Sequence, residues 1–195
     1  MKKLTKFFVI GMILIAGGTY LYNKITKPNL GPKTTQLYQH GFRLLEEQIG
    51  TYIKEHYTGI EKIEFSPIYV TGDDGSSMLN AYVRPTIYDQ HGNKATLGEP
   101  VNKFIPLSYG LYSYIILDFD GGGDEVIELM DSKDRLIDVS KEAYLPKKAK
   151  LTEARSTDEN ISLLVQEGQL ENVIKHENGS PEAQIIYNVE LKKGE

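Results

Sequence analysis

The change in hydrophobic period near residue 59 constrains the fold of this chain most strongly. In residues 36–59 apolar side chains recur every three or four positions, as along one face of an α-helix: Tyr38, Phe42, Leu45, Ile49 and Tyr52, with His56 at the end of the stripe. From residue 60 onward apolar and polar residues alternate, which is typical of β-strands. Gly59 separates the two patterns and is placed to end the helix. The sequence therefore predicts a long amphipathic helix followed by strands.

Two groups of strands follow this helix. Residues 60–72 and 76–89 lie on either side of the turn sequence GDDG and predict a hairpin. Pro67 and Pro85 fall inside these runs and predict an edge strand or a bulge, because proline has no N–H to donate. Further along, the sequences LYSYIILDF, EVIELMD and RLIDVS are separated by short polar turns and predict a three-stranded meander.

Two further elements are expected near the C-terminus. Ser156 and Glu159 form the pattern of a capping box, which predicts the start of a short helix that Gly168 ends. The last two apolar runs, on either side of Asn178 and Gly179, predict a C-terminal hairpin, with continuation of the short helix as the alternative. The expected fold class is α+β: an amphipathic helix packed on a mainly antiparallel sheet with hairpins and a second short helix.

Residues 1–25 predict a transmembrane helix that serves as a signal-anchor. Three lysines precede an uncharged run from Phe7 to Tyr22, which is the form of an export signal. This run is short for a bilayer, but Leu4 to Ile25 is long enough if the flanking lysines reach the headgroups. Cleavage at the small residues Ala16 and Gly18 is the alternative. Tyrosines and lysines at residues 20–27 resemble an interfacial anchor, so an uncleaved segment is favoured.

The expected domain organisation follows from this anchor. Residues 26–35 contain two prolines and a glycine and predict a short extended linker, and residues 36–195 form a single extracytoplasmic domain. The protein is therefore expected in the cell membrane, with a single pass and its domain outside the cytoplasm. The chain contains no cysteine, which excludes structural disulfides, thiolate metal sites, a cysteine nucleophile and lipidation at cysteine.

Charge is distributed unevenly along the chain. Residues 1–33 contain six lysines and no acidic residue, which leaves 16 basic against 27 acidic residues and a net charge of −11 for the remainder. Such a charge repels nucleic acid and favours a basic protein partner. The alternative interpretation is that an acidic surface only keeps the domain soluble and monomeric.

The sequence DFDGGGDE at residues 118–125 is the candidate metal site. Carboxylates and glycine carbonyls are the ligands that Ca²⁺ prefers, so a non-standard calcium site is predicted from Asp118, Asp120, Asp124 and Glu125. A standard EF-hand loop is excluded, because an EF-hand starting at Asp118 has Gly122 and Leu129 at ligand positions. The favoured interpretation is a hairpin turn in which the glycines supply positive φ angles. No other cofactor is expected.

Catalytic motifs are missing from the sequence. There is no phosphate-binding loop, no G-x-S-x-G and no H-E-x-x-H, and the four histidines lie in different expected elements. A non-enzymatic protein is therefore favoured. A calcium-binding or ligand-binding module, or a hydrolase, centred on residues 118–128 is the alternative, and it requires the carboxylates of Asp118, Asp120, Asp124 and Glu128 to converge.

The order of the predicted elements carries a resemblance. An anchor, a linker, a helix ending in YIKEHYTGIEKIEF and a following hairpin resemble the layout of small membrane-tethered extracytoplasmic proteins of Gram-positive bacteria. The resemblance covers about the first half of the chain and transfers no catalytic residue. Some proteins of this build serve as immunity or accessory factors beside secreted toxins. The resemblance therefore implies a membrane-anchored protein that acts by protein–protein binding.

Overall fold

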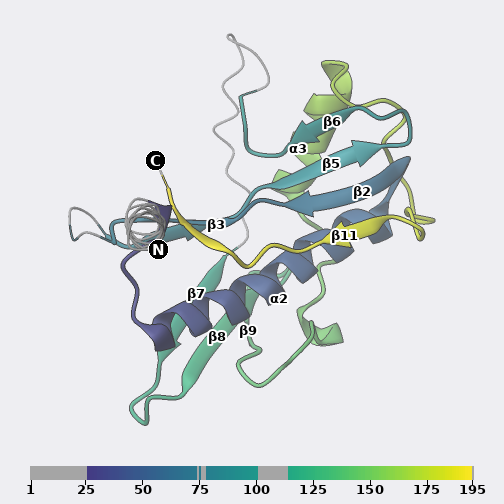
Figure 1. Cartoon of the computed structure of the whole chain (residues 1–195). Coiled ribbons are helices and arrows are strands. Elements are labelled where there is room, and N and C mark those ends of the chain that lie inside the picture. The colour runs from purple at the N-terminus through teal and green to yellow at the C-terminus, as the bar shows by residue number, and fades with distance from the viewer. Residues whose placement is uncertain (1–25, 74, 76–77, 101–113, 195) are drawn as a thin grey trace, which may run out of the picture.

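The computed structural model describes residues 26–73, 75, 78–100 and 114–194 (Figure 1). These residues form an α+β fold with two α-helices and mostly antiparallel sheets, as predicted. Among the described helices none has the length and hydrophobicity needed to cross a membrane. The predicted anchor, residues 1–25, lies outside the described residues.

The described elements follow one another along the chain as a long helix, a series of short strands, a second helix and three more short strands. They are α2 (Pro32–His56), β1 (Tyr57–Thr58), β2 (Ile60–Phe65), β3 (Ile68–Thr71), β4 (Asn80–Tyr82), β5 (Pro85–Asp89), β6 (Lys94–Thr96), β7 (Ile115–Phe119), β8 (Glu125–Met130), β9 (Leu136–Asp138), the 3₁₀ helix η1 (Lys147–Ala149), α3 (Arg155–Gln166), β10 (Ile174–Lys175), β11 (Gln184–Ile186) and β12 (Leu191–Lys193).

Helix α2 confirms the predicted amphipathic helix but begins earlier. Its first residue is Pro32, inside the predicted linker, with Gly31 as the N-cap. Proline is favoured in the first helical turn, because the N–H that it lacks would have no partner there. The helix ends at His56, and Gly59 follows with a φ of 82°.

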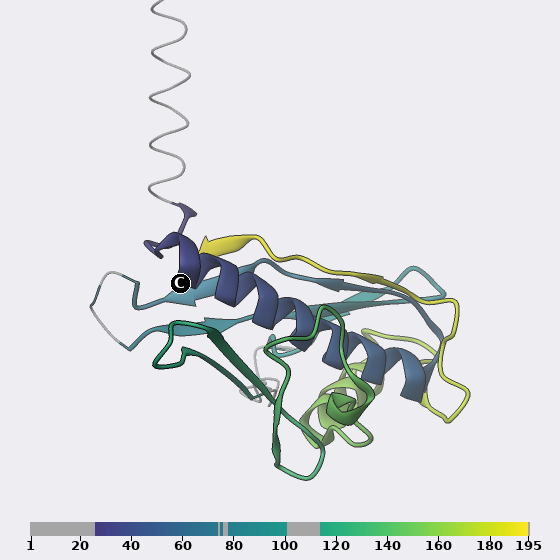
Figure 2. The same cartoon turned by 90° about the horizontal axis from the view of Figure 1, so that it is seen from below.

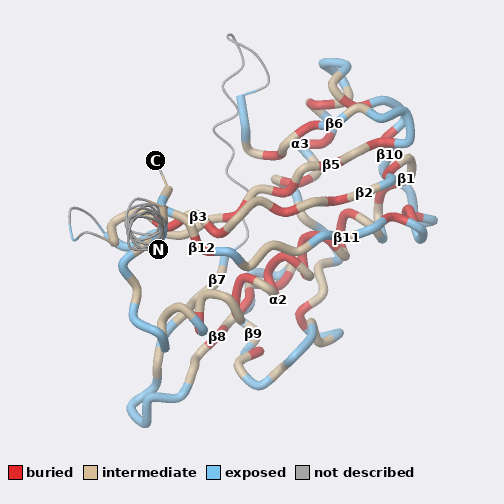
Figure 3. Tube along the Cα trace, viewed as in Figure 1, coloured by how far each residue is buried: buried red, intermediate tan, exposed pale blue. Residues whose placement is uncertain are grey.

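Helix α2 is buried on more than the predicted stripe, because it lies between two β layers (Figures 1 and 2). Phe42, Leu45, Ile49 and Tyr52 are buried as predicted, and the off-stripe residues Leu44, Glu46, Gln48 and Ile53 are buried as well. The buried residues of the helix and of the strands beside it form one continuous core (Figure 3).

Two glycines inside α2 mark the places where the sheets come closest. A Cβ added at Gly41 would collide with Leu117 of β7, and one at Gly50 would lie 2.9 Å from Ile185 of β11. Glycine in a helix interior costs about 1 kcal/mol relative to alanine. Close packing of a sheet on each side of the helix offsets this cost.

The main β layer consists of two halves of short strands, with a bend between them (Figure 1). Its two halves have the strand orders β11-β2-β5-β6 and β12-β3-β4. The predicted hairpin is confirmed in both halves, since β2 pairs with β5 and β3 pairs with β4 in antiparallel fashion. Pro67 separates β2 from β3 and Pro85 is the first residue of β5. Because β5 lies between β2 and β6, Pro85 is at the bend and not at a sheet edge.

The second β layer is the predicted meander. Strands β7, β8 and β9 pair in that order and are antiparallel. Ile115, Leu117 and Phe119 of β7 face the core together with Ile127 and Leu129 of β8. This layer covers the side of α2 that faces away from the main sheet (Figure 2).

The predicted C-terminal hairpin is wrong, and so is its helical alternative. Strand β10 pairs with β1, whereas β11 pairs in parallel with β2 and β12 in parallel with β3. Ile185 reaches the core only beside β2, where it packs against Gly50 of α2. The C-terminal apolar run therefore completes the main sheet through partners more than a hundred residues away in the chain.

The predicted capping box at Ser156 is also wrong. Helix α3 begins at Arg155 with Ala154 as its N-cap, and no side chain caps it. Glu159 pairs with Arg155 at 2.9 Å, so its carboxylate is directed at a side chain and not at the N-cap backbone. The other end agrees with the prediction, because Gly168 follows the last turn with a φ of 69°.

Candidate functional site

The acidic run 118–125 forms the tight turn between β7 and β8. Asp120 organises this turn: its Oδ1 accepts hydrogen bonds from the backbone N–H groups of Gly122 (2.8 Å) and Asp124 (2.9 Å). These backbone hydrogen bonds hold the pKa of Asp120 below its usual value. Of the three glycines only Gly123 has a positive φ, 84°. The prediction of a hairpin turn is confirmed.

Within the described turn the predicted ligands share no contact with one another through their carboxylates: Asp120 accepts backbone N–H groups of the turn, and Asp124 is exposed beside it. Asp118 is exposed, and its Oδ1 accepts the N–H of Phe119. Glu125 is paired with Phe119 across the hairpin and so lies on its inner face, where the carboxylate contacts Nδ1 of His40 on α2 at 2.9 Å. Glu128 is paired with Ile116 on the outer face. The carboxylates that a hydrolase at 118–128 would require are therefore spread along a hairpin.

The calcium hypothesis stays a prediction. Within the described residues no group of three or more His, Cys, Asp or Glu is arranged to hold a metal ion. If calcium nevertheless binds weakly at this turn, millimolar Ca²⁺ will raise the melting temperature of the protein, and Asp120→Asn will abolish the rise. Scanning calorimetry with and without Ca²⁺ measures it, with Mg²⁺ as the control for ionic strength. An unchanged melting temperature would contradict the hypothesis.

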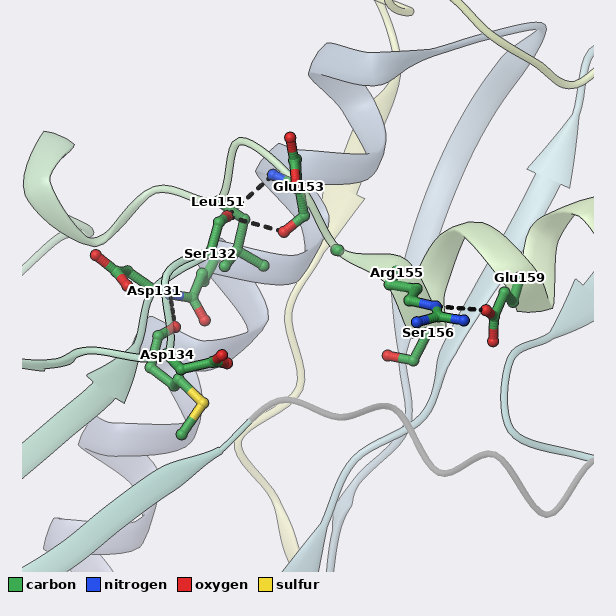
Figure 4. Close-up of a pocket in the computed structure, with 11 residues that line it drawn as sticks. Asp131, Ser132, Asp134, Leu151, Glu153, Arg155, Ser156 and Glu159 are labelled. Atoms are coloured by element: carbon green, nitrogen blue, oxygen red, sulfur yellow. Dashed lines mark hydrogen bonds and ion pairs between the residues drawn. The ribbon is translucent and has the colours of Figure 1, made fainter.

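A depression of about 450 Å³ lies elsewhere, between the β8–β9 turn and the start of α3 (Figure 4). One wall comes from Asp131, Ser132 and Asp134, and the other from Arg155, Ser156 and Glu159 of α3. Leu151 and Glu153 from the connecting segment complete the rim, and the buried Gln48 of α2 also lines it. We call this feature the acidic depression.

Local hydrogen bonds hold the first wall in place. Asp131 accepts the N–H groups of Lys133 and Arg135 and two further hydrogen bonds from the Arg135 guanidinium, at 2.8 and 2.6 Å. The hydrogen bonds from the Arg135 side chain lower the pKa of Asp131 to about 2. The tight turn places Asp134 at a φ of 57°, a conformation that aspartate tolerates better than most residues.

The connecting segment is fastened to this turn. Ser132 Oγ accepts the N–H groups of Thr152 and Glu153 and donates to the carbonyl of Glu153. Gln48 Nε2 donates to the carbonyls of Met130 at the end of β8 and Ala149 of η1, which joins both of these segments to α2. The positions of the charged side chains on the rim are thus set by a fixed backbone.

The depression carries more negative than positive charge. Four carboxylates line it against one guanidinium, that of Arg155. Arg135 neutralises Asp131 and Arg155 neutralises Glu159. Within the described part of the chain, no hydrogen bond or ion pair engages the carboxylates of Asp134 and Glu153. Two uncompensated carboxylates are therefore available to a cationic group.

A second polar cluster joins α2, α3 and β10. The carboxylate of Asp158 accepts hydrogen bonds from the hydroxyls of Tyr52 (2.8 Å) and Tyr57 (2.6 Å) and from Lys175 Nζ (2.6 Å). Burial, and then the hydrogen bonds to Asp158, raise the pKa of both tyrosines. The tyrosines are therefore neutral donors at physiological pH, and the cluster connects structural elements instead of supplying a nucleophile.

Glu46 is the most unusual ionisable residue of α2. It is fully buried; its Oε2 accepts the N–H of Asn188 at 2.9 Å, and its Oε1 has no hydrogen-bond partner among the described residues. Burial raises the pKa of Glu46 to about 7, although the hydrogen bond from Asn188 and the charge of Arg43 act in the opposite direction. Four residues after Phe42, Glu46 lies beside the apolar stripe, but a glutamate side chain predicts exposure and so gives no signal of burial.

Sequence patterns indicated neither the acidic depression nor these polar clusters. Their residues come from separate segments, and no spacing along the chain connects Gln48 with Asp134 and Glu153, or Tyr52 with Asp158. The one available signal was the net acidity of the chain after residue 33. Comparison with protein families, curated proteins and solved structures finds no match for this chain, so its function has to be inferred from its own residues.

Proposed function

We propose that this protein is anchored in the cell membrane by residues 1–25 and acts outside the cytoplasm as a non-enzymatic protein-binding module. A basic segment of a partner protein docks in the acidic depression. The observation that supports this most directly is the pair of uncompensated carboxylates, Asp134 and Glu153, on the rim of a depression of about 450 Å³.

The surrounding charge supports the same partner chemistry. The chain after residue 33 has a net charge of −11, which attracts a basic partner over a distance of about one Debye length, roughly 8 Å at physiological salt. The rim carboxylates then select lysine or arginine side chains, since charge-assisted hydrogen bonds are about twice as strong as neutral ones. An immunity or accessory factor that meets a basic toxin or secreted protein would use such a surface.

The experiment uses the full chain in detergent and a fluorescent octapeptide of lysine and arginine. Fluorescence anisotropy of the peptide measures its binding to the protein. Neutralising the rim in Asp134→Asn/Glu153→Gln is expected to weaken binding about tenfold, because two charge-assisted contacts of under 1 kcal/mol each are lost. Asparagine is chosen at residue 134 because it also tolerates a positive φ.

A matched control separates the depression from the general charge of the domain. Glu61→Gln/Glu177→Gln removes the same charge from exposed residues that do not line the depression. This control is expected to bind the peptide with nearly unchanged affinity. Equal losses in both double variants, or no detectable binding by the unmodified chain, would contradict the proposal.

A further inference from the structure

The end of the domain at which the described chain begins is held together by specific contacts. The backbone N–H of Asn29 donates to Asp73 Oδ2 at 2.8 Å, and Lys193 Nζ lies 3.5 Å from the same oxygen. Gly194 N–H donates to the carbonyl of Val70. The segment before α2, the β3–β4 hairpin and the end of β12 therefore lie together, as Figure 1 shows.

The β3–β4 hairpin presents apolar side chains to solvent at this end. Met78 is 89% exposed, the highest value among the large hydrophobic residues of the described chain, and the adjacent Leu79 is 39% exposed. Leu79 directly precedes β4, whose first residue Asn80 pairs with Thr71. These side chains are therefore at the tip of a paired hairpin and do not belong to the core.

Four lysines belong to the segments that meet the hairpin at this end, in contrast to the acidity of the rest of the domain. Lys27 and Lys33 are exposed, and Lys192 and Lys193 lie on β12. Lys192 pairs with Glu190, and Lys193 pairs with Asp73. The four lysines outnumber these two acids, so the lysines and their partners together carry a net positive charge. We call Lys27, Lys33, Met78, Leu79, Lys192 and Lys193 the basal surface.

We propose that the basal surface contacts the outer face of the lipid bilayer, with Met78 and Leu79 in the headgroup region and the lysines beside anionic headgroups. The inference rests on the membrane anchor of the proposed function. Asn29 is seven residues after Tyr22, the last residue of the apolar run, so extended chain separates them by at most about 25 Å. Its hydrogen bond to Asp73 then holds the hairpin near the membrane.

Contact at the basal surface sets the orientation of the acidic depression. Gln48, which lines the depression, lies about 24 Å along the axis of α2 from Pro32, at a rise of 1.5 Å per residue. Anionic headgroups repel the acidic remainder of the domain and attract the lysines. The depression is thereby kept away from the lipid and accessible to a partner.

The experiment uses the full chain in phosphatidylcholine vesicles with and without phosphatidylglycerol. Because the chain has no cysteine, Met78→Cys is labelled at a single position with an environment-sensitive fluorophore. Ile174→Cys is the matched control: Ile174 is 59% exposed and lies in β10, which pairs with β1 directly after the C-terminal end of α2. Lipids with brominated acyl chains then report depth by quenching.

The label at residue 78 is expected to lose about half of its emission in brominated vesicles, because apolar groups at the interface reach about 5–10 Å into the boundary between headgroups and acyl chains. The label at residue 174 is expected to keep its emission. Phosphatidylglycerol should increase the difference in quenching between the labels at residues 78 and 174. Equal quenching at both positions, or none at residue 78, overturns the inference. Peptide binding in the vesicles without phosphatidylglycerol tests the proposed function separately, since the peptide does not bind neutral lipid and the acidic depression and the labelled positions share no residue.

Discussion

Replacing Asp158 by alanine is expected to lower the free energy of unfolding by about 2–4 kcal/mol. The carboxylate of Asp158 accepts the hydroxyls of Tyr52 and Tyr57, which are 1% and 4% exposed. Without this acceptor two buried hydroxyls lose their partner, and each unsatisfied group costs about 1–3 kcal/mol. The loss also weakens the junction of α3 with α2 and β1, because Asp158 is the residue of α3 that accepts hydrogen bonds from both tyrosines.

Urea unfolding of residues 26–195, which contain the entire described core, measures this loss. Asp158→Asn is the matched variant, since its amide oxygen still accepts hydrogen bonds from the tyrosines, and it should cost much less than alanine. Lys175→Gln should change stability by under about 1 kcal/mol, because Lys175 is 49% exposed and an exposed ion pair contributes little. If the alanine and asparagine variants unfold at the same urea concentration, the tyrosine hydrogen bonds do not stabilise this junction.

Raising the pH from 5 to 8 is expected to lower the free energy of unfolding by up to about 3 kcal/mol through Glu46. Burial raises the pKa of Glu46 to about 7, whereas an unfolded glutamate titrates near 4.5. Between about pH 4.5 and pH 7 the folded chain binds more protons than the unfolded chain, so the free energy of unfolding falls as the pH rises. The stabilising difference is complete below about pH 4.5 and is lost as the pH passes 7.

The variant Glu46→Gln isolates this effect, because glutamine does not titrate. His40 contributes a trend of the same sign: burial lowers its pKa, but hydrogen bonds with Glu125 and the Glu142 carbonyl outweigh burial and raise it. Glu46→Gln should therefore flatten most but not all of the pH dependence. Unfolding in urea at both pH values gives the measurement, with the exposed Glu61→Gln as control. A slope that survives unchanged in Glu46→Gln would show that Glu46 is ionised in the folded chain across this range.

Local patterns were reliable where neighbouring residues decide the structure. The stripe from Phe42 to Tyr52 predicted α2, because helical spacing places these side chains on one face. The alternation in residues 60–72 and the GDDG turn predicted the first hairpin, and the polar turns after Phe119 and Met130 predicted the meander. In the acidic run, Asp120 accepts hydrogen bonds from residues two and four positions ahead, which is again a local interaction.

Local patterns failed where distant segments compete for the same residues. The C-terminal apolar run had the features of a hairpin, but Ile185 is buried only when it pairs beside β2 and packs on Gly50. The capping box at Ser156 failed for a different and local reason, because Glu159 pairs with Arg155 four residues before it.

By itself the sequence determined the fold class, the order of most elements and the concentration of acidic charge after residue 33. Only the tertiary structure decided which carboxylates share one depression: Asp134 of the β8–β9 turn and Glu153 of the connecting segment line it together. It also decided that Glu46 is buried between α2 and the segment at Asn188. The physical reason is that charge depends on composition, whereas pairing and burial depend on which segments the fold brings within a few ångströms of one another.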